Sequence, residues 1–218
     1  MPVGSNSIRS QGGLSLIVLA GGKSQRMGSD KAFLIYRGKS FVQLIVEEMM
    51  KISNDTIVVI GQKGEDNFRD VLDRSVRILK DELELGNPIG GMITGFSHAK
   101  YRYAAVLACD SPLVKHAVIK YLCDSAQEHS ASVPIWENND TEPLCAVYDL
   151  EQALIAVTKV LRLGKMGPKN LLAQLADVNY VPVSRIREYD PLLESLVNIN
   201  SREDYIRLLS GITNPIAK

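Results

Sequence analysis

The chain has 218 residues, of which 45% are hydrophobic, and its 25 basic residues balance its 25 acidic ones. A chain of this length can bury a full core as one domain. Its neutral net charge excludes the general electrostatic field that holds nucleic acid or an anionic membrane. Its apolar runs have the length of strands and fall short of the roughly 20 residues that a membrane-spanning helix needs. We therefore expect a soluble protein without a nucleic-acid partner or a membrane segment.

Two further features favour a reducing cytoplasm. Cys109, Cys123 and Cys145 are odd in number and widely spaced, with no histidine close by in the sequence. This spacing argues against both a disulfide framework and a zinc site. Residues 1–13 are polar and contain glycine but no apolar signal core, so we expect a flexible tail there and not an export signal.

The pattern of apolar residues predicts alternating strands and helices. Continuous apolar, β-branched runs are typical of buried strands, and apolar residues three or four apart are typical of amphipathic helices. In chain order the predicted elements are a strand at 15–20, a helix at 41–52, a strand at 56–60, a helix at 66–73, a strand at 76–79, a helix at 89–99, a strand at 103–108, a helix at 114–127, strands at 131–135 and 144–148, helices at 151–161 and 169–175, a strand at 178–183 and a helix at 201–209.

This alternation predicts an α/β fold with three layers, in which helices cover both faces of a doubly wound, mostly parallel sheet. Ligands of such sheets bind beyond the carboxyl ends of the strands, near the switch in strand order. We therefore expect the loops after Ala20, Leu79 and Ala108 to converge. The glycine- and proline-containing segment 162–169 is the best candidate for a mobile loop.

The first of these loops, residues 19–31, is built to bind phosphate. It combines three glycines with Lys23, Arg26 and Lys31 directly after a buried strand. Glycines let backbone N–H groups point into a concavity, and the cations compensate the charge of a polyphosphate. Its spacing matches neither the P-loop nor the Gly-x-Gly-x-x-Gly motif, so ATPase and dehydrogenase functions lose their usual support. Composition alone leaves open a glycine-rich turn with solvated charges.

The same segment resembles the Leu-Ala-Gly-Gly-x3-Arg-Met-Gly-x-Asp-Lys signature of the MobA family of molybdenum cofactor guanylyltransferases. Residues 87–92 resemble the Gly-Pro-Leu-Ala-Gly-Met motif of that family, and residues 109–112 resemble its Cys-Asp-Thr-Pro motif. Residues 197–201 resemble Val-Asn-Val-Asn-Thr. Order and spacing agree over nearly the whole chain, from about residue 14 to residue 209.

The resemblance implies a Rossmann-like nucleotidyltransferase fold in one domain, residues 14–211. Residues 14–112 would form the nucleotide-binding half, and residues 113–211 would form the acceptor-binding half. The resemblance further implies that the loop binds GTP and that Arg26 and Lys31 stabilise charge on the departing diphosphate. The residues expected to bind the nucleotide are Leu19, Ala20, Gly21, Gly22, Lys31, Asp81 and Asp110.

Asp110 and Asn200 are the candidate ligands of Mg²⁺. Asp110 lies between a buried strand and a proline, where a carboxylate can meet Mg²⁺ beside phosphates. From position alone it could equally cap the following helix, but the resembled family uses it as a metal ligand. Asn200 would supply a second metal contact by analogy with the wider superfamily. Arg202 stands two positions further on, where the family has proline, so simple turn chemistry stays open for Asn200.

Asp81 matches an aspartate that the family places against the nucleotide. A carboxylate can accept the N1–H and N2–H pair of guanine. Local composition alone would make Asp81 one more charge in the charged segment 80–84. Several relatives also carry a nucleotide-contacting asparagine where this chain has Gly61, so that contact must be lost or supplied by backbone.

The resemblance implies transfer of GMP from Mg-GTP to the phosphate of molybdopterin, or of its molybdenum-loaded form. The residues 19–22, Leu-Ala-Gly-Gly, favour GTP over CTP, because cytidylyl relatives begin this loop with Ala-Ala-Gly. Other proteins of molybdenum cofactor biosynthesis are the expected protein partners. A related enzyme acting on a sugar phosphate or cobinamide phosphate stays open, as does a nucleotide sensor without catalysis.

Overall fold

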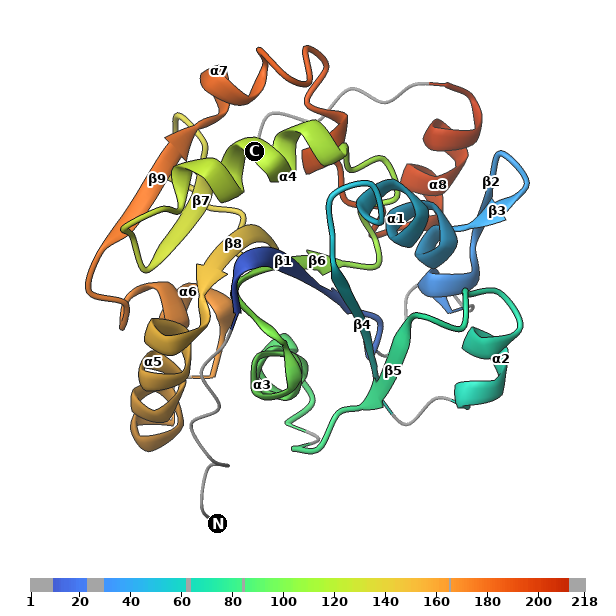
Figure 1. The fold of residues 1–218 in the computed structure, drawn as a ribbon. Helices are drawn as coiled ribbons and strands as arrows, with labels where there is room; N and C mark the ends of the chain where they lie inside the picture. The colour runs from blue at the N-terminus through green and yellow to red at the C-terminus, as the bar shows by residue number, and fades with distance from the viewer. Residues whose placement is uncertain (1–9, 23–29, 62–63, 84, 165, 212–218) are drawn as a thin grey trace.

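One seven-stranded sheet runs through the molecule in the computed structural model, which describes residues 10–22, 30–61, 64–83, 85–164 and 166–211 (Figure 1). Its strands, in sequence order, are β1 (Ser10–Leu19), β4 (Asp55–Ile60), β5 (Arg77–Lys80), β6 (Tyr101–Ala108), β7 (Ala131–Ile135), β8 (Cys145–Asp149) and β9 (Val178–Pro182). A separate small hairpin pairs β2 (Ile35–Tyr36) with β3 (Lys39–Ser40).

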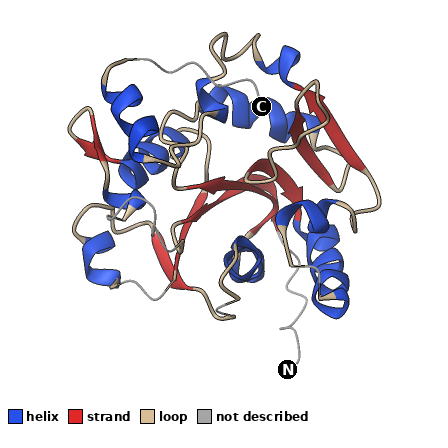
Figure 2. Ribbon diagram, turned by 180° about the vertical axis from the view of Figure 1, so that it is seen from behind, coloured by secondary structure: helices blue, strands red, loops and turns tan. Residues whose placement is uncertain are grey.

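Helices cover both faces of the sheet, as Figure 1 and the view from behind in Figure 2 show. The described helices are α1 (Phe41–Met49), α2 (Glu65–Arg69), α3 (Pro88–His98), α4 (His116–Ser125), α5 (Leu150–Leu163), α6 (Pro168–Leu172), α7 (Val183–Ile186) and α8 (Arg202–Leu209), with 3₁₀ turns at η1 (Lys31–Phe33) and η2 (Glu194–Leu196). The strand β1 shows why two cores form. Leu16 and Val18 pack in one apolar cluster with α1 and α4, while Ile17 packs in the other with α3 and α5, because successive side chains point to opposite faces.

The strand order β5-β4-β1-β6-β8-β7-β9 confirms the predicted doubly wound, mostly parallel sheet. β1 lies between β4 and β6 and runs parallel to both. β8 alone runs against its neighbours β6 and β7. Its reversal brings the β7–β8 connection to the edge where β1 and β6 end. The carboxyl edge of the sheet therefore joins parts of both halves of the chain.

The structure corrects several predicted boundaries. β1 begins at Ser10, so residues 10–13 belong to the sheet and not to the expected tail; Ser10 pairs with Tyr101 of β6, with a shift in register before Leu14. The helix expected at 66–73 is the short α2, and the helix expected at 114–127 begins two residues later. The β2–β3 hairpin, α7 and both 3₁₀ turns were not predicted, because each is too short to show a period.

The segment 162–169 contains two helix ends. α5 stops at Gly164, whose φ of 65° is the left-handed conformation that glycine adopts without steric cost. α6 then begins with a proline in its first turn. Mobility of this segment stays a prediction. In the described part of the chain, no helix combines the length and apolar character needed to cross a membrane.

Candidate active site

The loops after β1, β5 and β6 converge at the carboxyl edge of the sheet, as predicted. Just beyond β1, the backbone of Ala20 donates to Val59. Cys109 N, just beyond β6, donates to the Leu19 carbonyl at 3.1 Å. Asp81 N, just beyond β5, donates to the Ile60 carbonyl at 2.7 Å. These backbone hydrogen bonds continue the pairing of the sheet one residue beyond each strand and so fix where each of the three loops begins.

Glycine is required where the first loop leaves the sheet. Gly21 passes so close to Gly61 that a Cβ atom on Gly61 would lie 2.8 Å from the Gly21 carbonyl oxygen. A side chain at either position would push the two backbones apart. The loop continues into residues 23–29, and the predicted catalytic residue Arg26 therefore lies outside the described residues.

Lys31 brings three predicted site residues together. Its Nζ donates to Asp110 Oδ2 at 3.1 Å and to Asn200 Oδ1 at 2.7 Å, although these residues lie 79 and 169 positions away along the chain. The Asp30 side chain accepts from Ala32 N and so caps the 3₁₀ turn that carries Lys31. The Lys31 and Asp110 side chains are 17% and 20% exposed, so the pair is only partly open to water.

Asp110 and Asn200 are held together through their neighbours as well. Ile199 N donates to the Asp110 carbonyl at 2.8 Å, and Ser111 Oγ donates to Asn198 Oδ1 at the same distance. Asp110 caps no described helix, since α4 begins at His116. The helix-cap alternative for Asp110 is therefore wrong within the described chain.

The turn at Asn200 is built by the start of α8. Ser201 and Asp204 form a reciprocal capping box, in which Asp204 also accepts from Asn200 N at 3.0 Å. Burial alone would raise the pKa of Asp204, but the hydrogen bonds from Ser201 and Asn200 lower it below its usual value. The cap uses the backbone of Asn200 and leaves its amide oxygen to accept from Lys31 Nζ.

The oxygen atoms of Asp110 and Asn200 fit Mg²⁺ that arrives with phosphates. The described residues hold no cluster of three or more His, Cys, Asp or Glu side chains that would make an all-protein metal site. Mg²⁺ commonly takes one or two protein oxygens and completes its shell with water and substrate phosphates. One carboxylate and one amide oxygen are the donor set that such a site needs.

Asp81 lies against the first turn of α3. A Cβ atom on Gly90 would lie 2.7 Å from Asp81 Oδ2, so glycine leaves the room that this carboxylate occupies. Asp81 Oδ1 accepts from Leu83 N at 3.0 Å, and Asn87 caps α3 through Ile89 N. A helix N-terminus favours a negative charge beside it. Asp81, which is predicted to contact the nucleotide, and the family motif at residues 87–92 are therefore neighbours.

A buried polar pair lies in the β7–β8 connection, at the same edge of the sheet. Trp136 Nε1 donates to Glu142 Oε1 at 2.8 Å, and both side chains are buried. Lys169, at the start of α6, forms an ion pair with Asp140 of the same connection. The local sequence does not mark Glu142 as buried.

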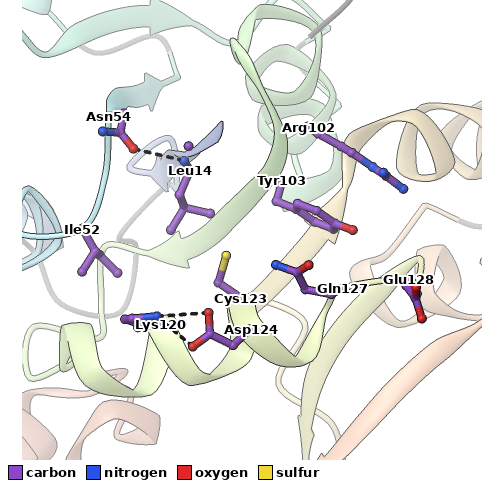
Figure 3. A pocket seen from close by; sticks show the side chains of 11 residues that line it. Leu14, Ile52, Asn54, Arg102, Tyr103, Lys120, Cys123, Asp124, Gln127 and Glu128 are labelled. Carbon is purple, nitrogen blue, oxygen red and sulfur yellow. Dashed lines mark hydrogen bonds and ion pairs between the residues drawn. The ribbon is translucent and has the colours of Figure 1, made fainter. Parts of the chain in front are cut away.

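A cavity of about 560 Å³ lies at the opposite edge of the sheet, near the starts of β1, β4 and β6 (Figure 3). Its lining residues are Gly13, Leu14, Ile52, Asn54, Arg102, Tyr103, Lys120, Cys123, Asp124, Gln127 and Glu128. None of the predicted site residues that the structure describes lines it. The cavity is therefore not at the carboxyl edge, where doubly wound sheets bind their ligands.

Comparison with known proteins identifies the family. The sequence profile of the MobA-like NTP transferase domain matches residues 16–178. The chain belongs to this family. Among its MobA-like relatives, the probable molybdenum cofactor guanylyltransferase of Methanosarcina mazei is 34% identical over 196 residues, covering 87% of each chain. That of Methanosarcina acetivorans is 30% identical and covers 93% of this chain and 92% of its own.

A solved structure of a MobA-like protein has the same fold. The molybdopterin-guanine dinucleotide biosynthesis protein A of Archaeoglobus fulgidus superimposes with a TM-score of 0.74 at 25% sequence identity. The match covers 90% of this chain and 97% of that one. This MobA-like chain is therefore a nucleotidyltransferase, with the cluster of Lys31, Asp110 and Asn200 at the edge where such folds bind ligands.

Proposed function

We propose that this enzyme transfers GMP from Mg-GTP to the phosphate of molybdopterin, or of molybdenum-loaded molybdopterin, and releases diphosphate. The observation that carries the proposal is the contact of Lys31 Nζ with both Asp110 and Asn200. It unites a cation for phosphate and two oxygens for a metal in a chain whose relatives are named molybdenum cofactor guanylyltransferases.

The reaction needs positioning and charge neutralisation more than a protein nucleophile. An oxygen of the acceptor phosphate forms a bond to the α-phosphorus of GTP while the bond to the diphosphate oxygen breaks in line. The acceptor oxygen is already anionic, so no serine, cysteine or histidine has to be activated. Fixed donors and cations that meet the charge of the departing diphosphate supply most of the rate in such transfers.

Each site residue has a place in this scheme. Leu19 ends the strand and Ala20 follows it, and the backbone of Gly21 and Gly22 just beyond them presents N–H groups to the nucleotide. Lys31 neutralises the β- and γ-phosphates, together with Arg26, which is assigned from the motif alone. Asp110 and Asn200 hold Mg²⁺, which when bound draws negative charge from the phosphate oxygens.

Choice of guanine falls to Asp81 on this proposal. Its carboxylate lies beside the opening turn of α3, where Gly90 leaves space. The N1–H and N2–H groups of guanine are two donors for a carboxylate, whereas cytosine lacks that pair. This reasoning supports GTP over CTP. The cytoplasm is the proposed compartment, with other proteins of molybdenum cofactor biosynthesis as partners that deliver or receive the pterin.

A panel of acceptors tests the proposal. Purified protein would be given Mg²⁺ and GTP with molybdopterin, a hexose 1-phosphate or cobinamide phosphate, and release of diphosphate would be followed. Release with molybdopterin alone supports the proposal. Release only with the sugar phosphate or cobinamide phosphate would keep the enzyme class and refute this acceptor. GTP binding without diphosphate release from any acceptor would favour a sensor.

A further inference from the structure

Three buried aspartates pair with cations in the described chain, and only one of these pairs lies at the active edge. Asp55 pairs with Arg77 at the start of β4, and Asp149 pairs with Arg102 at the end of the reversed strand β8. Both lie at the amino edge of the sheet. The third, Asp190, follows α7 at the carboxyl edge.

The buried side chain of Asp190 is hydrogen-bonded to two neighbouring segments of the chain. This side chain has no exposed surface, and it accepts from Lys115 Nζ and from Ser195 N, both at 2.7 Å. Lys115 N in turn donates to Ser195 Oγ at 3.0 Å, and Lys115 Nζ also pairs with Glu194. Burial would raise the pKa of Asp190, but these hydrogen bonds outweigh it and hold the pKa below its usual value. The group is therefore a buried carboxylate at neutral pH.

These contacts continue to the proposed metal site. The segment from Asp110 to Lys115 and the segment from Asp190 to Asn200 lie side by side. Lys115 contacts Asp190 and Ser195 at one end, and the two hydrogen bonds that join residues 110 and 111 to residues 199 and 198 lie at the other. The buried carboxylate thus anchors the segment whose far end carries the Asn200 amide oxygen.

The ion pair between buried Asp190 and partly exposed Lys115 is a weak source of net stability, because the cost of removing the carboxylate from water offsets the attraction. Its stronger effect is to select one arrangement of the groups that it joins. Here the groups joined are the two segments that carry Asp110 and Asn200.

We propose that Asp190 is a positioning residue: by holding Ser195 and Lys115 it fixes Asn200 relative to Asp110 and so strengthens metal binding in the GTP complex. The inference rests on the proposed metal role of Asn200. Residues that orient metal ligands typically change metal affinity by about 10- to 100-fold when replaced. The effect is expected on the metal and not on GTP itself.

The test measures how far Mg²⁺ strengthens GTP binding. The dissociation constant of GTP would be determined by calorimetry with EDTA and with saturating Mg²⁺, without acceptor, and the ratio of the two constants compared among variants. We expect Asp190→Asn to lower the ratio about tenfold, by analogy with other outer ligand-orienting groups. Asp55→Asn removes a matched buried charge at the far edge and should leave the ratio unchanged while lowering thermal stability.

A double variant separates positioning from general damage. If Asp190 acts through Asn200, then Asp190→Asn should add little to the loss caused by Asn200→Ala alone. Fully additive losses would overturn the inference. An unchanged ratio in Asp190→Asn and in Ser195→Ala would also overturn the inference. If Asp190→Asn does not fold, the milder variant Ser195→Ala decides the question. An unchanged ratio in Asn200→Ala would refute the metal role of Asn200 and this inference with it.

Discussion

Lys31 Nζ lies 3.1 Å from Asp110 Oδ2 and also contacts Asn200 Oδ1. The lysine ammonium therefore binds the same two oxygens that we assign to the metal. A lysine ammonium in that place repels a divalent ion until phosphates draw the lysine toward themselves. Binding of metal and nucleotide should therefore be coupled.

The first prediction follows from this contact. Lys31→Met should bind Mn²⁺ several-fold more tightly than the wild type without nucleotide, because the competing positive charge is gone. The same variant should lose about 10²- to 10³-fold in kcat, since a donor to the departing diphosphate is lost. Electron paramagnetic resonance of free Mn²⁺ and a turnover assay measure the two effects.

Lys120→Met is the matched control for this prediction, because Lys120 pairs with Asp124 beside the remote cavity. It should change neither Mn²⁺ affinity nor turnover. Weaker Mn²⁺ binding in Lys31→Met than in the wild type would contradict the account.

The second prediction concerns recognition of guanine by Asp81. ITP lacks the 2-amino group of GTP, so a carboxylate that accepts both N1–H and N2–H should favour GTP. A hydrogen bond to a charged group contributes about 1.5–3 kcal/mol, which corresponds to a preference of at least about tenfold in kcat/KM. Asp81→Ala should bring the ratio of kcat/KM for GTP to kcat/KM for ITP close to one, mostly by lowering kcat/KM for GTP. An unchanged ratio would show that Asp81 does not read the base.

The third prediction concerns acid stability. Glu48 of α1 accepts from His116 N at 3.1 Å and from His116 Nδ1 at 2.6 Å, and it also pairs with Lys51. Burial would raise its pKa, but the hydrogen bonds from Lys51 and His116 lower it to about 2. A carboxyl group with a lowered pKa stabilises the fold above its usual pKa. That stabilisation is lost as the pH falls from about 4.5 toward about 2.

Urea unfolding followed by circular dichroism at several pH values measures this effect. Glu48→Gln should show a shallower fall in the free energy of unfolding between pH 4.5 and 2 than the wild type. Lys51→Met keeps the carboxylate but removes one partner, so its slope should be intermediate. Equal slopes in all three proteins would refute the role of Glu48.

The sequence predicted the centre of the fold for physical reasons, and the resemblance singled out residues that the structure brings together. The apolar runs of β1, β4 and β6 are buried on both faces, which makes them continuous and easy to recognise. Lys31, Asp110 and Asn200 each lie in a motif with a fixed place in the chain, and the structure brings all three into contact. The assignment of Arg26 stays a prediction.

The parts that could not be predicted depend on partners that the local pattern of residues does not reveal. Nothing in the local sequence marks Asp190 or Glu142 as buried. Burial of Asp190 depends on Lys115, which lies 75 residues away along the chain. Burial of Glu142 depends on the turn that brings Trp136 to it. The start of β1 at Ser10 depends on pairing with Tyr101 of β6, which overrides the polar, glycine-containing composition of residues 10–13.

The most direct test of the central claim is the release of diphosphate by purified protein with Mg²⁺ and molybdopterin, compared side by side for GTP, ATP and CTP. The account predicts release with GTP and a loss of about 10²- to 10³-fold in Asp110→Asn, whose fold should persist because the side chain keeps its shape. Equal or faster release with CTP, or full activity in Asp110→Asn, would contradict it.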